Sequence, residues 1–427
     1  MRSKFLLPLL LTSLSIQAQV LNQKSVASRS SPLQPEPIRA AQISSLDFEN
    51  RGQLARFFKN LKSAGINTVI VRVFQNPKDG FHKLCAPAAE TGYYFKTNSA
   101  PVVCDLVGTI AEEAHAADLK FYAWMNSRYA DYGIENRTDL HSRGYDFASK
   151  KYRPSPGLCI FHPEVRARLF SLFEDLACYP VDGVLVQDDL MMKHNEDFHP
   201  LAVRDYLRER GKAASPSAFY QKVEFRGDKV LVGKYTNDFR EWTQWKASKL
   251  LELADGLRES LRSKNPGIKF GFNFYYETGL KPGQALEWFS QDVKLAAARN
   301  YDFYSLMLYH RQIADELKLD DQELDSAVAS AAGNFISAVN SPCAALIKLM
   351  TKDFKTGESI PEGELKRIIG KIPERSHAGV AFFTVSAGME KEVSNLISNW
   401  EKGDEKTYYR RPSDRADSSR QLQAEKR

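Results

Sequence analysis

The sequence predicts a single (β/α)8 barrel of the TIM type. Eight apolar segments with strand character follow one another between residues 41 and 400, and segments with helical spacing separate most of them. No short turn joins one of these strands to the next, as it would in an antiparallel sheet. A chain of 427 residues with 43% hydrophobic residues is long enough to bury the core of such a barrel.

The first four strands and their helices follow in regular order. TVIVRVF (68–74) is a continuous apolar run, which is typical of a parallel strand covered on both faces. The weaker segment 43–48 precedes it, and two further strands are expected at 119–125 and 182–189. Helical spacing predicts helices at 54–64, where Gly65 ends the helix, at 102–117, and at 163–178, where Pro163 occupies the first turn.

The second half continues this order after a longer helical region. Helices are expected at 200–210 and 236–263, with a small hairpin or excursion between them at 222–234. The remaining four strands are predicted at 269–275, 301–309, 344–350 and 379–385. No internal repeat is visible, so one barrel accounts for residues 41–400.

The two ends of the chain differ from the barrel. Arg2 and Lys4 precede a short apolar run, and small residues follow up to Ala18, which predicts a secretory signal peptide over residues 1–18. The apolar run is too short for a membrane anchor. Residues 19–40 are rich in Ser, Pro and polar residues, which predicts a flexible linker, and the charged tail 401–427 has no apolar period, which predicts disorder. The mature protein is therefore expected to be exported to the periplasm, with secretion as the second choice, and not to span a membrane.

The net charge of +6 does not favour nucleic-acid binding. The signal segment, the linker and the tail each contribute +2, so the barrel region is neutral overall. Without clustered Lys and Arg, the barrel has no electrostatic footprint for phosphates.

The five cysteines, at 85, 104, 159, 178 and 343, have no metal-ligand spacing. In an oxidising compartment either Cys85–Cys104 or Cys159–Cys178 could form a disulfide, and at least one thiol stays free. Neither a metal nor a cofactor is expected.

The segment DGVLVQDD (182–189) is the strongest candidate for catalytic residues. It is a short apolar strand that ends in two adjacent carboxylates, and the C-terminal ends of barrel strands are where catalytic groups are placed. Strand alternation puts Leu185, Gln187 and Asp189 on one face, assigned to the barrel interior, and Asp188 on the other. Two neighbouring carboxylates raise each other's pKa, so that one can act as an acid. The alternative is that the aspartates cap the next helix or pair with an Arg.

Other strand ends contribute carboxylates and aromatic rings. Rings can stack on sugar faces, and carboxylates can bind hydroxyl groups and catalyse glycosidic cleavage, so this mixture is typical of a carbohydrate site. The candidates are Asp47, Trp124, Asp131, Asn273, Tyr275, Glu277, Trp288 and Tyr309. Some have a structural alternative: Trp124 as a core residue, Asp47 and Asp131 as loop caps, and Glu277 as a turn residue. Of the adjacent Tyr275 and Tyr276, at most one can point inward.

Seven sequence segments recur, in the same order, in one known bacterial family. They are YYFKTN with Pro101 and Asp105-Leu106, FYAWM with Asp131, FHPEVRA, DGVLVQDD, FREWTQWKASKL, FNFYY with EWF, and YDFYSLML. Through these segments the chain resembles the C-terminal glycoside hydrolase domains of periplasmic poly-β-1,6-N-acetylglucosamine deacetylases, which form glycoside hydrolase family 153. The resemblance extends over nearly the whole barrel, from about Asp47 to Val385.

The resemblance implies a barrel enzyme that acts on partially deacetylated β-1,6-linked N-acetylglucosamine polymer. It would cut bonds within the polymer chain and would not need a metal. It places the paired aspartates at Asp188 and Asp189, and it suggests a polysaccharide export apparatus as a partner. The family's groove residues fall on Asp47, Trp124, Asp131, Asn273, Tyr275 and Trp288.

The chain departs from the family at three points. Gln187 stands where the family usually has a His, and Tyr309 and His310 stand where its sixth strand ends in a Met-Pro pair. The metal-dependent deacetylase domain that precedes the family's barrel is absent from this sequence, so no deacetylase activity is expected. The substrate can therefore differ from that of the family.

These observations predict an exported glycosidase, endo-acting, on an amino-sugar polysaccharide. Asp189 is predicted to be the general acid, and Asp188 to orient the substrate's amino or acetamido group or to tune Asp189. Asp131, Glu277 and the substrate's own acetamide are the candidates for the second catalytic group.

Two rival hypotheses remain open. One is a non-catalytic glycan-binding protein that uses the same groove during export, which a groove with Asp189 turned away from it would favour. The other is a barrel glycosidase with a different glycan substrate.

Overall fold

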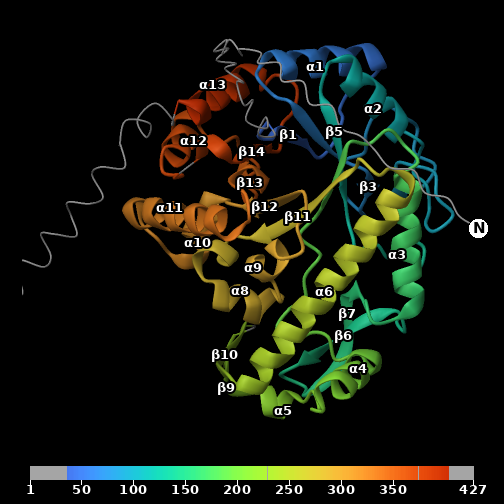
Figure 1. Cartoon of the computed structure of the whole chain (residues 1–427), viewed down its shortest axis with the longest axis vertical. Helices are drawn as coiled ribbons and strands as arrows, with labels where there is room; N and C mark the ends of the chain where they lie inside the picture. The colour runs from blue at the N-terminus through green and yellow to red at the C-terminus, as the bar shows by residue number, and fades with distance from the viewer. Residues whose placement is uncertain (1–35, 228, 374, 403–427) are drawn as a thin grey trace, which may run out of the picture. The chain divides into compact units, whose positions relative to one another are not determined.

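Eight parallel strands close into a barrel in the computed structural model, which describes residues 36–402 except 228 and 374 (Figure 1). Each strand pairs in parallel with its two neighbours around the ring. The strands are β1 (Arg39–Ile43), β2 (Thr68–Arg72), β5 (Lys120–Met125), β8 (Gly183–Val186), β11 (Lys269–Tyr275), β12 (Phe303–Met307), β13 (Ala345–Met350) and β14 (Gly379–Phe383). The predicted (β/α)8 barrel is confirmed.

Helices follow the strands and cover the outside of the barrel (Figure 1). Asn50 caps the first helix by accepting a hydrogen bond from the Gln53 N–H, and Asp320 with Glu323 forms a capping box at another helix start. The longer helices are α1 (Arg51–Ser63), α2 (Val107–Ala116), α3 (Pro163–Leu176), α4 (Pro200–Arg210), α6 (Asn237–Lys264), α10 (His310–Leu317), α11 (Asp321–Ala338), α12 (Glu362–Ile369) and α13 (Glu390–Glu401). The shorter ones are α5 (Pro216–Phe219), α7 (Glu277–Leu280), α8 (Pro282–Phe289) and α9 (Val293–Ala297).

The first strand lies earlier than the sequence predicts. The prediction placed it at 43–48 and extended the linker to residue 40, whereas β1 spans Arg39–Ile43. Two of its residues, Ala40 and Ala41, have little strand propensity. They form a strand because β1 pairs with β2 on one side and β14 on the other, so the tertiary contacts decide its position. The predicted signal peptide, most of the linker and nearly all of the tail lie outside the described residues.

The lower part of the barrel interior is closed by side chains. A cluster from the inward faces of the strands fills it: Ala40, Ile70, Tyr122, Leu185, Phe303, Leu346 and Ala381. Gly183 makes room for Tyr122, because a Cβ at Gly183 would lie 2.7 Å from the tyrosine ring. A Cβ at Gly271 would lie 2.3 Å from the carbonyl oxygen of Phe303. Polar groups therefore have room only towards the C-terminal ends of the strands.

A side lobe extends from the loops that follow β5 and β8. It contains two antiparallel hairpins, β6 (His141–Asp146) with β7 (Lys151–Leu158), and β9 (Tyr220–Arg226) with β10 (Lys229–Tyr235), and its labels lie together at the bottom of Figure 1. The lobe has its own aromatic core, which includes Phe219, Tyr220, Phe239, Trp242 and Trp245. The hairpin expected at 222–234 is confirmed. The β6–β7 hairpin was not predicted, because its polar and proline-containing segments do not alternate in the way that a half-buried strand does.

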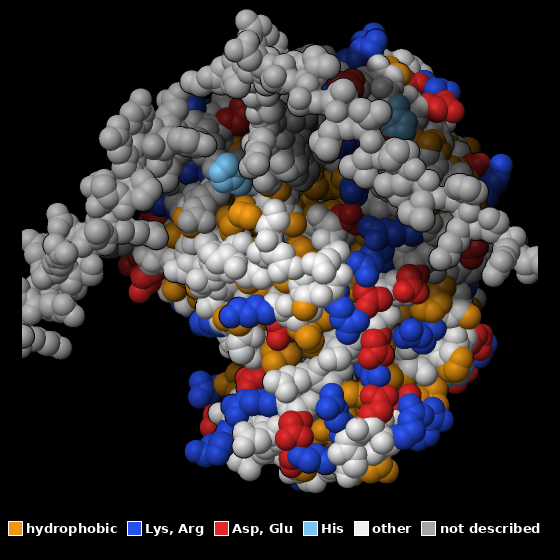
Figure 2. Space-filling model, viewed as in Figure 1, with side chains coloured by type: hydrophobic (Ala, Val, Ile, Leu, Met, Phe, Trp, Pro, Cys, Tyr) orange, Lys and Arg blue, Asp and Glu red, His pale blue; other side chains and the backbone are white. Residues whose placement is uncertain are grey.

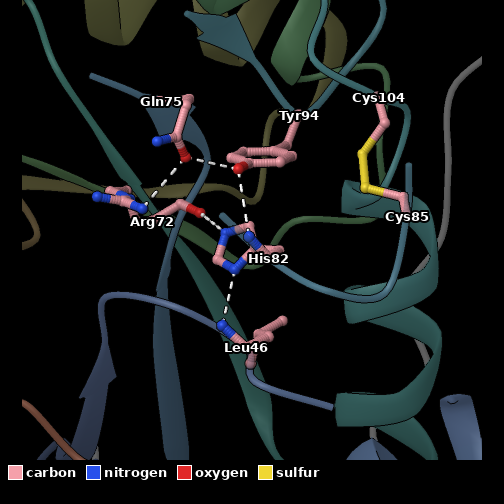
Figure 3. Close-up of a disulfide and its surroundings, with 7 residues drawn as sticks. All are labelled: Leu46, Arg72, Gln75, His82, Cys85, Tyr94 and Cys104. Atoms are coloured by element: carbon pink, nitrogen blue, oxygen red, sulfur yellow. Dashed lines mark hydrogen bonds between the residues drawn. A yellow bond between two sulfur atoms is a disulfide. The ribbon is translucent and has the colours of Figure 1, made fainter. Parts of the chain in front are cut away.

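A disulfide joins Cys85 to Cys104 in the long loop after β2 (Figure 3). It confirms the first of the two expected pairings. The second does not form, because Cys159 is a buried free thiol and Cys178 an exposed one. The disulfide thus closes a loop over the C-terminal end of the barrel.

His82 fastens the same loop to the barrel (Figure 3). Its Nδ1 accepts a hydrogen bond from the Leu46 N–H at 2.8 Å, and its Nε2 donates to the Arg72 carbonyl oxygen at 2.8 Å. Burial lowers the pKa of His82 to about 3, so the imidazole is neutral and can make both bonds at once. His82 therefore has a structural role.

Acidic and basic side chains intermingle on the surface of the barrel and lobe. Figure 2 shows Lys and Arg next to Asp and Glu over the lower half of this face. This mixture fits the neutral net charge of the barrel region. In the part of the chain that the structure describes, no helix combines the length and the apolar character that crossing a membrane requires.

Candidate active site

Aromatic and charged side chains meet at the C-terminal ends of the barrel strands and form the barrel mouth. Pairing partners in a parallel sheet point to the same face. Trp124 pairs with Leu185 and Lys348 with Ala381, and both partners belong to the interior cluster, so Trp124 and Lys348 point into the barrel. The barrel mouth consists of Trp124, Asp188, Tyr275, Tyr309, Lys348 and Phe383.

Asp188 is the carboxylate of the barrel mouth. The hydroxyl of Tyr275 donates a hydrogen bond to Asp188 Oδ2 at 3.1 Å. Burial, and then the negative charge of Asp188, raise the pKa of Tyr275 above its ordinary value, so this phenol remains a donor. Burial and Asp188 raise the pKa of Tyr309 in the same way. Because Asp188 itself is only half-buried, it can meet a ligand that enters the mouth.

Tyr275 is held in place by its ring as well as by its hydroxyl. The ring stacks on Phe289 with centroids 4.3 Å apart and an interplanar angle of 24°. The neighbouring Tyr276 points the other way and donates to Glu316 at 2.8 Å. Only one of the two tyrosines faces inward, as strand alternation requires.

Tyr275→Phe is expected to lower kcat/KM about tenfold, because it removes one hydrogen bond to a charged group at the reacting site. The stacking on Phe289 stays, so the melting temperature should not change. Steady-state kinetics and thermal unfolding measure the two quantities. Tyr276→Phe is the matched control and should keep full activity; an equal loss in both variants would contradict the role of the Tyr275 hydroxyl.

Lys348 is a fully buried lysine in the barrel mouth. Its Nζ donates to Asn273 Oδ1 at 2.7 Å and lies 6.0 Å from the centroid of the Phe383 ring. Burial lowers the pKa of Lys348 to about 7, and the negative charge of Asp188 opposes this shift. Lys348 is not among the predicted site residues. The available signal was one cation within ALIKLM (345–350), a strand buried at every position.

Asp189 is turned away from the barrel mouth, and the prediction that it faces the cleft is wrong. Its side chain is 1% exposed. Oδ2 accepts hydrogen bonds from the backbone N–H groups of Ser127 at 2.7 Å and Tyr129 at 2.9 Å, and Oδ1 accepts from Ser127 Oγ at 2.8 Å. The prediction extended strand alternation to residue 189, but β8 ends at Val186 and a turn follows. The orientation of Asp189 alone would favour the glycan-binding alternative, whereas Asp188, which meets Tyr275, offers the carboxylate that catalysis needs.

Arg128 holds the same loop from its other side. This guanidinium is fully buried, donates to the Met191 carbonyl oxygen and pairs with Glu196 at 3.2 Å. Gly157 leaves room for it, because a Cβ there would lie 2.5 Å from Arg128 Nη2. The hydrogen bonds of Asp189 and Arg128 thus join the loop after β5 to the loop after β8. Asp189 acts as a positioning residue in this contact.

Asp189→Ala is expected to lower the free energy of unfolding by about 2 kcal/mol, because it leaves two buried backbone N–H groups without an acceptor. Asp189→Asn should cost about 0.5 kcal/mol or less: its oxygen can accept both N–H bonds, and its NH2 can donate to Ser127 Oγ. Denaturant unfolding of the two variants measures the difference. Equal destabilisation would show that the charge of Asp189, rather than its acceptor geometry, matters.

The stability of the protein should also depend on pH through Asp189. Burial raises its pKa from the ordinary 3.8 to about 6, against the three hydrogen bonds that lower it. Since the folded protein holds this proton more tightly than the unfolded chain, the stabilisation is complete below pH 3.8 and is lost as the pH rises through 6. Relative to Asp189→Asn, the wild type should therefore be more stable at pH 4 than at pH 7. Unfolding curves at both pH values test this sign.

Three further predicted site residues have no hydrogen bond or ion pair with Asp188. The Asp47 side chain is 72% exposed and pairs with Lys83 at 2.5 Å. Asp131 pairs with His141 at 3.3 Å, and this hydrogen bond raises the pKa of the histidine. Glu277 is buried, which raises its pKa to about 7, and Glu316 adds to the shift.

Aromatic rings line the mouth and continue beyond it. The Trp124 ring meets Phe74 and Phe383 edge to face, with centroids 5.8 and 5.4 Å apart. The ring centroids of Phe354 and Tyr309 are 5.3 Å apart, and Phe354 is 58% exposed. Phe354 therefore extends the aromatic surface from the mouth towards solvent.

Trp288 lines two cavities next to the barrel mouth. The larger, about 630 Å³, also contains Tyr276, Arg311 and Phe354. The smaller, about 330 Å³, contains Leu231 from the lobe and Phe289, the ring that stacks on Tyr275. Exposed rings beside polar groups suit the stacking and hydrogen bonding of sugar units.

The described residues contain no cluster of His, Cys, Asp and Glu that could hold a metal ion. The side chains that the barrel mouth offers are the Asp188 carboxylate, the Tyr275 phenol and the Lys348 amine.

Comparison with protein families gives a match over residues 48–383 to the model described as hypothetical glycosyl hydrolase family 13. Comparison with curated proteins gives no match. Among solved structures, the PgaB (BpsB) glycoside hydrolase domain from Bordetella bronchiseptica is 18% identical with a TM-score of 0.65, over 84% of this chain and 99% of that one.

Two other glycosidases share the fold at lower similarity. The catalytic domain of the β-amylase from Paenibacillus polymyxa is 11% identical with a TM-score of 0.51, over 86% of this chain and 98% of that one. The cold-adapted β-galactosidase from Rahnella sp. R3 is 14% identical with a TM-score of 0.53, over 84% of this chain and 56% of that one.

Proposed function

Because the chain belongs to the hypothetical glycosyl hydrolase family 13, we propose that this glycoside hydrolase is exported and cleaves an amino-sugar polysaccharide. The substrate that we propose is partially deacetylated β-1,6-linked N-acetylglucosamine polymer, or a close relative, cut within the chain. The resemblance of seven sequence segments to the deacetylase-linked glycoside hydrolase domains supports this choice, as does the aromatic mouth.

The observation that carries the mechanism is the half-buried Asp188, bound by Tyr275 in an aromatic mouth. Asp188 in its protonated form would donate its proton to the glycosidic oxygen as the bond to the leaving sugar breaks. The Tyr275 hydroxyl would then stabilise the carboxylate that remains. Asp189 would keep the loop in place.

Asp131 is paired with His141, and burial raises the pKa of Glu277 to about 7, so we assign the second catalytic group to the substrate's acetamide. The acetamido carbonyl oxygen of the sugar would attack the anomeric carbon while the glycosidic bond breaks and Asp188 protonates the leaving oxygen. Water would then open the cyclic intermediate, with the Asp188 carboxylate taking up the proton of the water. Anomeric configuration would be retained.

Export is supported by the disulfide and by the N-terminal sequence. A stable Cys85–Cys104 bond fits an oxidising compartment such as the periplasm, or the outside of the cell as the second choice. A polysaccharide export apparatus would be the partner in that setting.

The test is mass spectrometry of products from partially deacetylated β-1,6-glucosamine oligomers incubated with the wild type and with Asp188→Asn. Shorter oligomers from the wild type alone are the expected result. Intact oligomers that bind would instead indicate a glycan-binding role, and neither cleavage nor binding would indicate a different glycan.

A further inference from the structure

Four inward side chains from alternate strands form a polar layer at the base of the barrel mouth, next to the closed interior. In an eight-stranded barrel, a layer takes its four side chains from alternate strands. Gln42 on β1, Trp124 on β5, Asn273 on β11 and Lys348 on β13 occupy such positions. The hydrogen bond from Lys348 to Asn273, two strands apart, joins two members of the layer.

The layer contains polar atoms that are buried without a partner. Trp124 Nε1 is a donor, and Gln42 Oε1 an acceptor, and neither has a hydrogen bond to any described residue. Gln42 is 1% exposed. Buried polar groups are normally paired, so these atoms point to a polar ligand group that enters the layer.

Lys348 fixes the direction of the Asn273 carboxamide. A protonated lysine can only donate, so it must meet the amide oxygen and not the amide nitrogen. Asn273 Nδ2 then keeps its two N–H donors on the side of the carboxamide that does not meet Lys348. Without Lys348, nothing in this contact would prevent the amide from turning its oxygen towards the mouth.

We propose that Lys348 is a positioning residue that acts through Asn273, so that the polar layer presents N–H donors to an oxygen acceptor of the bound sugar. The acceptor is the acetamido carbonyl or a hydroxyl oxygen. An ammonium group is rejected at Asn273, because it brings only donors and faces the charge of Lys348, whereas Gln42 Oε1 accepts a bond from an N–H or O–H of the same sugar. This inference rests on the proposed function and names the group that its site recognises.

The test is a double-mutant cycle on kcat/KM for β-1,6-glucosamine oligomers that carry acetyl groups, measured at pH 6. At this pH Lys348 is protonated in the wild type. Lys348→Met and Asn273→Ala should each lower kcat/KM about tenfold, mainly through KM, because each removes one donor to the sugar. The double variant should also lose about tenfold and not a hundredfold, since Lys348 works through Asn273.

Lys348→Arg is the conservative variant, because its guanidinium, like the ammonium group, can only donate to Asn273 Oδ1. It should recover most of the kcat/KM that Lys348→Met loses. Equal losses in Lys348→Arg and Lys348→Met, or additive losses in the cycle, would overturn the proposal. The melting temperature of each variant shows whether a loss of activity comes from the removed contact or from unfolding of the protein.

The outcome is distinct from that of the proposed function. If the wild type cleaves no oligomer, the proposed function fails, and the same cycle is measured on oligomer affinity by calorimetry. If oligomers neither bind nor react, the proposal is overturned as well, because the polar layer then has no sugar acceptor.

Discussion

Asp188→Asn is expected to lower kcat/KM on β-1,6-glucosamine oligomers about a thousandfold, whereas Asp189→Asn should stay within about tenfold of the wild type. A positioned general acid contributes about 10²–10⁴ in rate, and an amide cannot donate a proton to a leaving oxygen in its place. Asp188 is half-buried in the mouth and bound by Tyr275. Asp189 accepts three hydrogen bonds from the loop after β5 and does not reach the mouth.

Steady-state kinetics on the two variants, with circular dichroism to confirm folding, measures this difference. The variants are a matched pair, since they make the same change at adjacent positions. If a folded Asp189→Asn lost all cleavage while Asp188→Asn kept it, the acid role would return to Asp189. Loss of cleavage in both variants would indicate that Asp188 acts only when the hydrogen bonds of Asp189 hold the loop in place.

Replacement of both Cys85 and Cys104 by Ser is expected to lower the free energy of unfolding by about 3 kcal/mol. The two residues are 19 positions apart, and in the chain-entropy model a closed loop of this length stabilises the folded state by roughly that amount. The loop also carries His82, which ties it to β2 and to Leu46. Its opening should therefore weaken the C-terminal end of the barrel first.

Denaturant unfolding with and without a reducing agent measures the effect. Reduction should destabilise the wild type by the same amount and leave the double variant unchanged. Cys178→Ser, which alters an exposed free thiol, is the control and should have no effect. A reductant effect that persists in the double variant would assign the stabilisation to another bond.

The aromatic mouth could be predicted in part from the sequence. Tyr275 and Trp124 stand at the ends of clear apolar strands, and one of the two adjacent tyrosines had to face inward. Trp288 was predicted as a groove residue, and it lines two cavities beside the mouth. Asp47, Asp131 and Glu277 also follow strands, but their loops lead them to Lys83, His141 and the neighbourhood of Glu316. The position of a strand in the sequence predicts the end of the barrel at which the following residues lie. It does not predict where a side chain in the following loop points.

The sequence by itself determined the barrel, the order of its strands and the short strand that leads to the adjacent aspartates, because apolar period and segment length are local properties of the chain. Only the tertiary structure decided the position of β1. Its alanines form a strand because β1 pairs with β2 on one side and with β14 on the other. It also decided which aspartate faces the mouth. Strand alternation ends at Val186, and in the turn beyond it the backbone N–H groups of Ser127 and Tyr129 hold the side chain of Asp189. The meeting of Lys348 with Asn273 has the same cause: the two residues are 75 positions apart, and only closure of the barrel brings them within hydrogen-bonding distance.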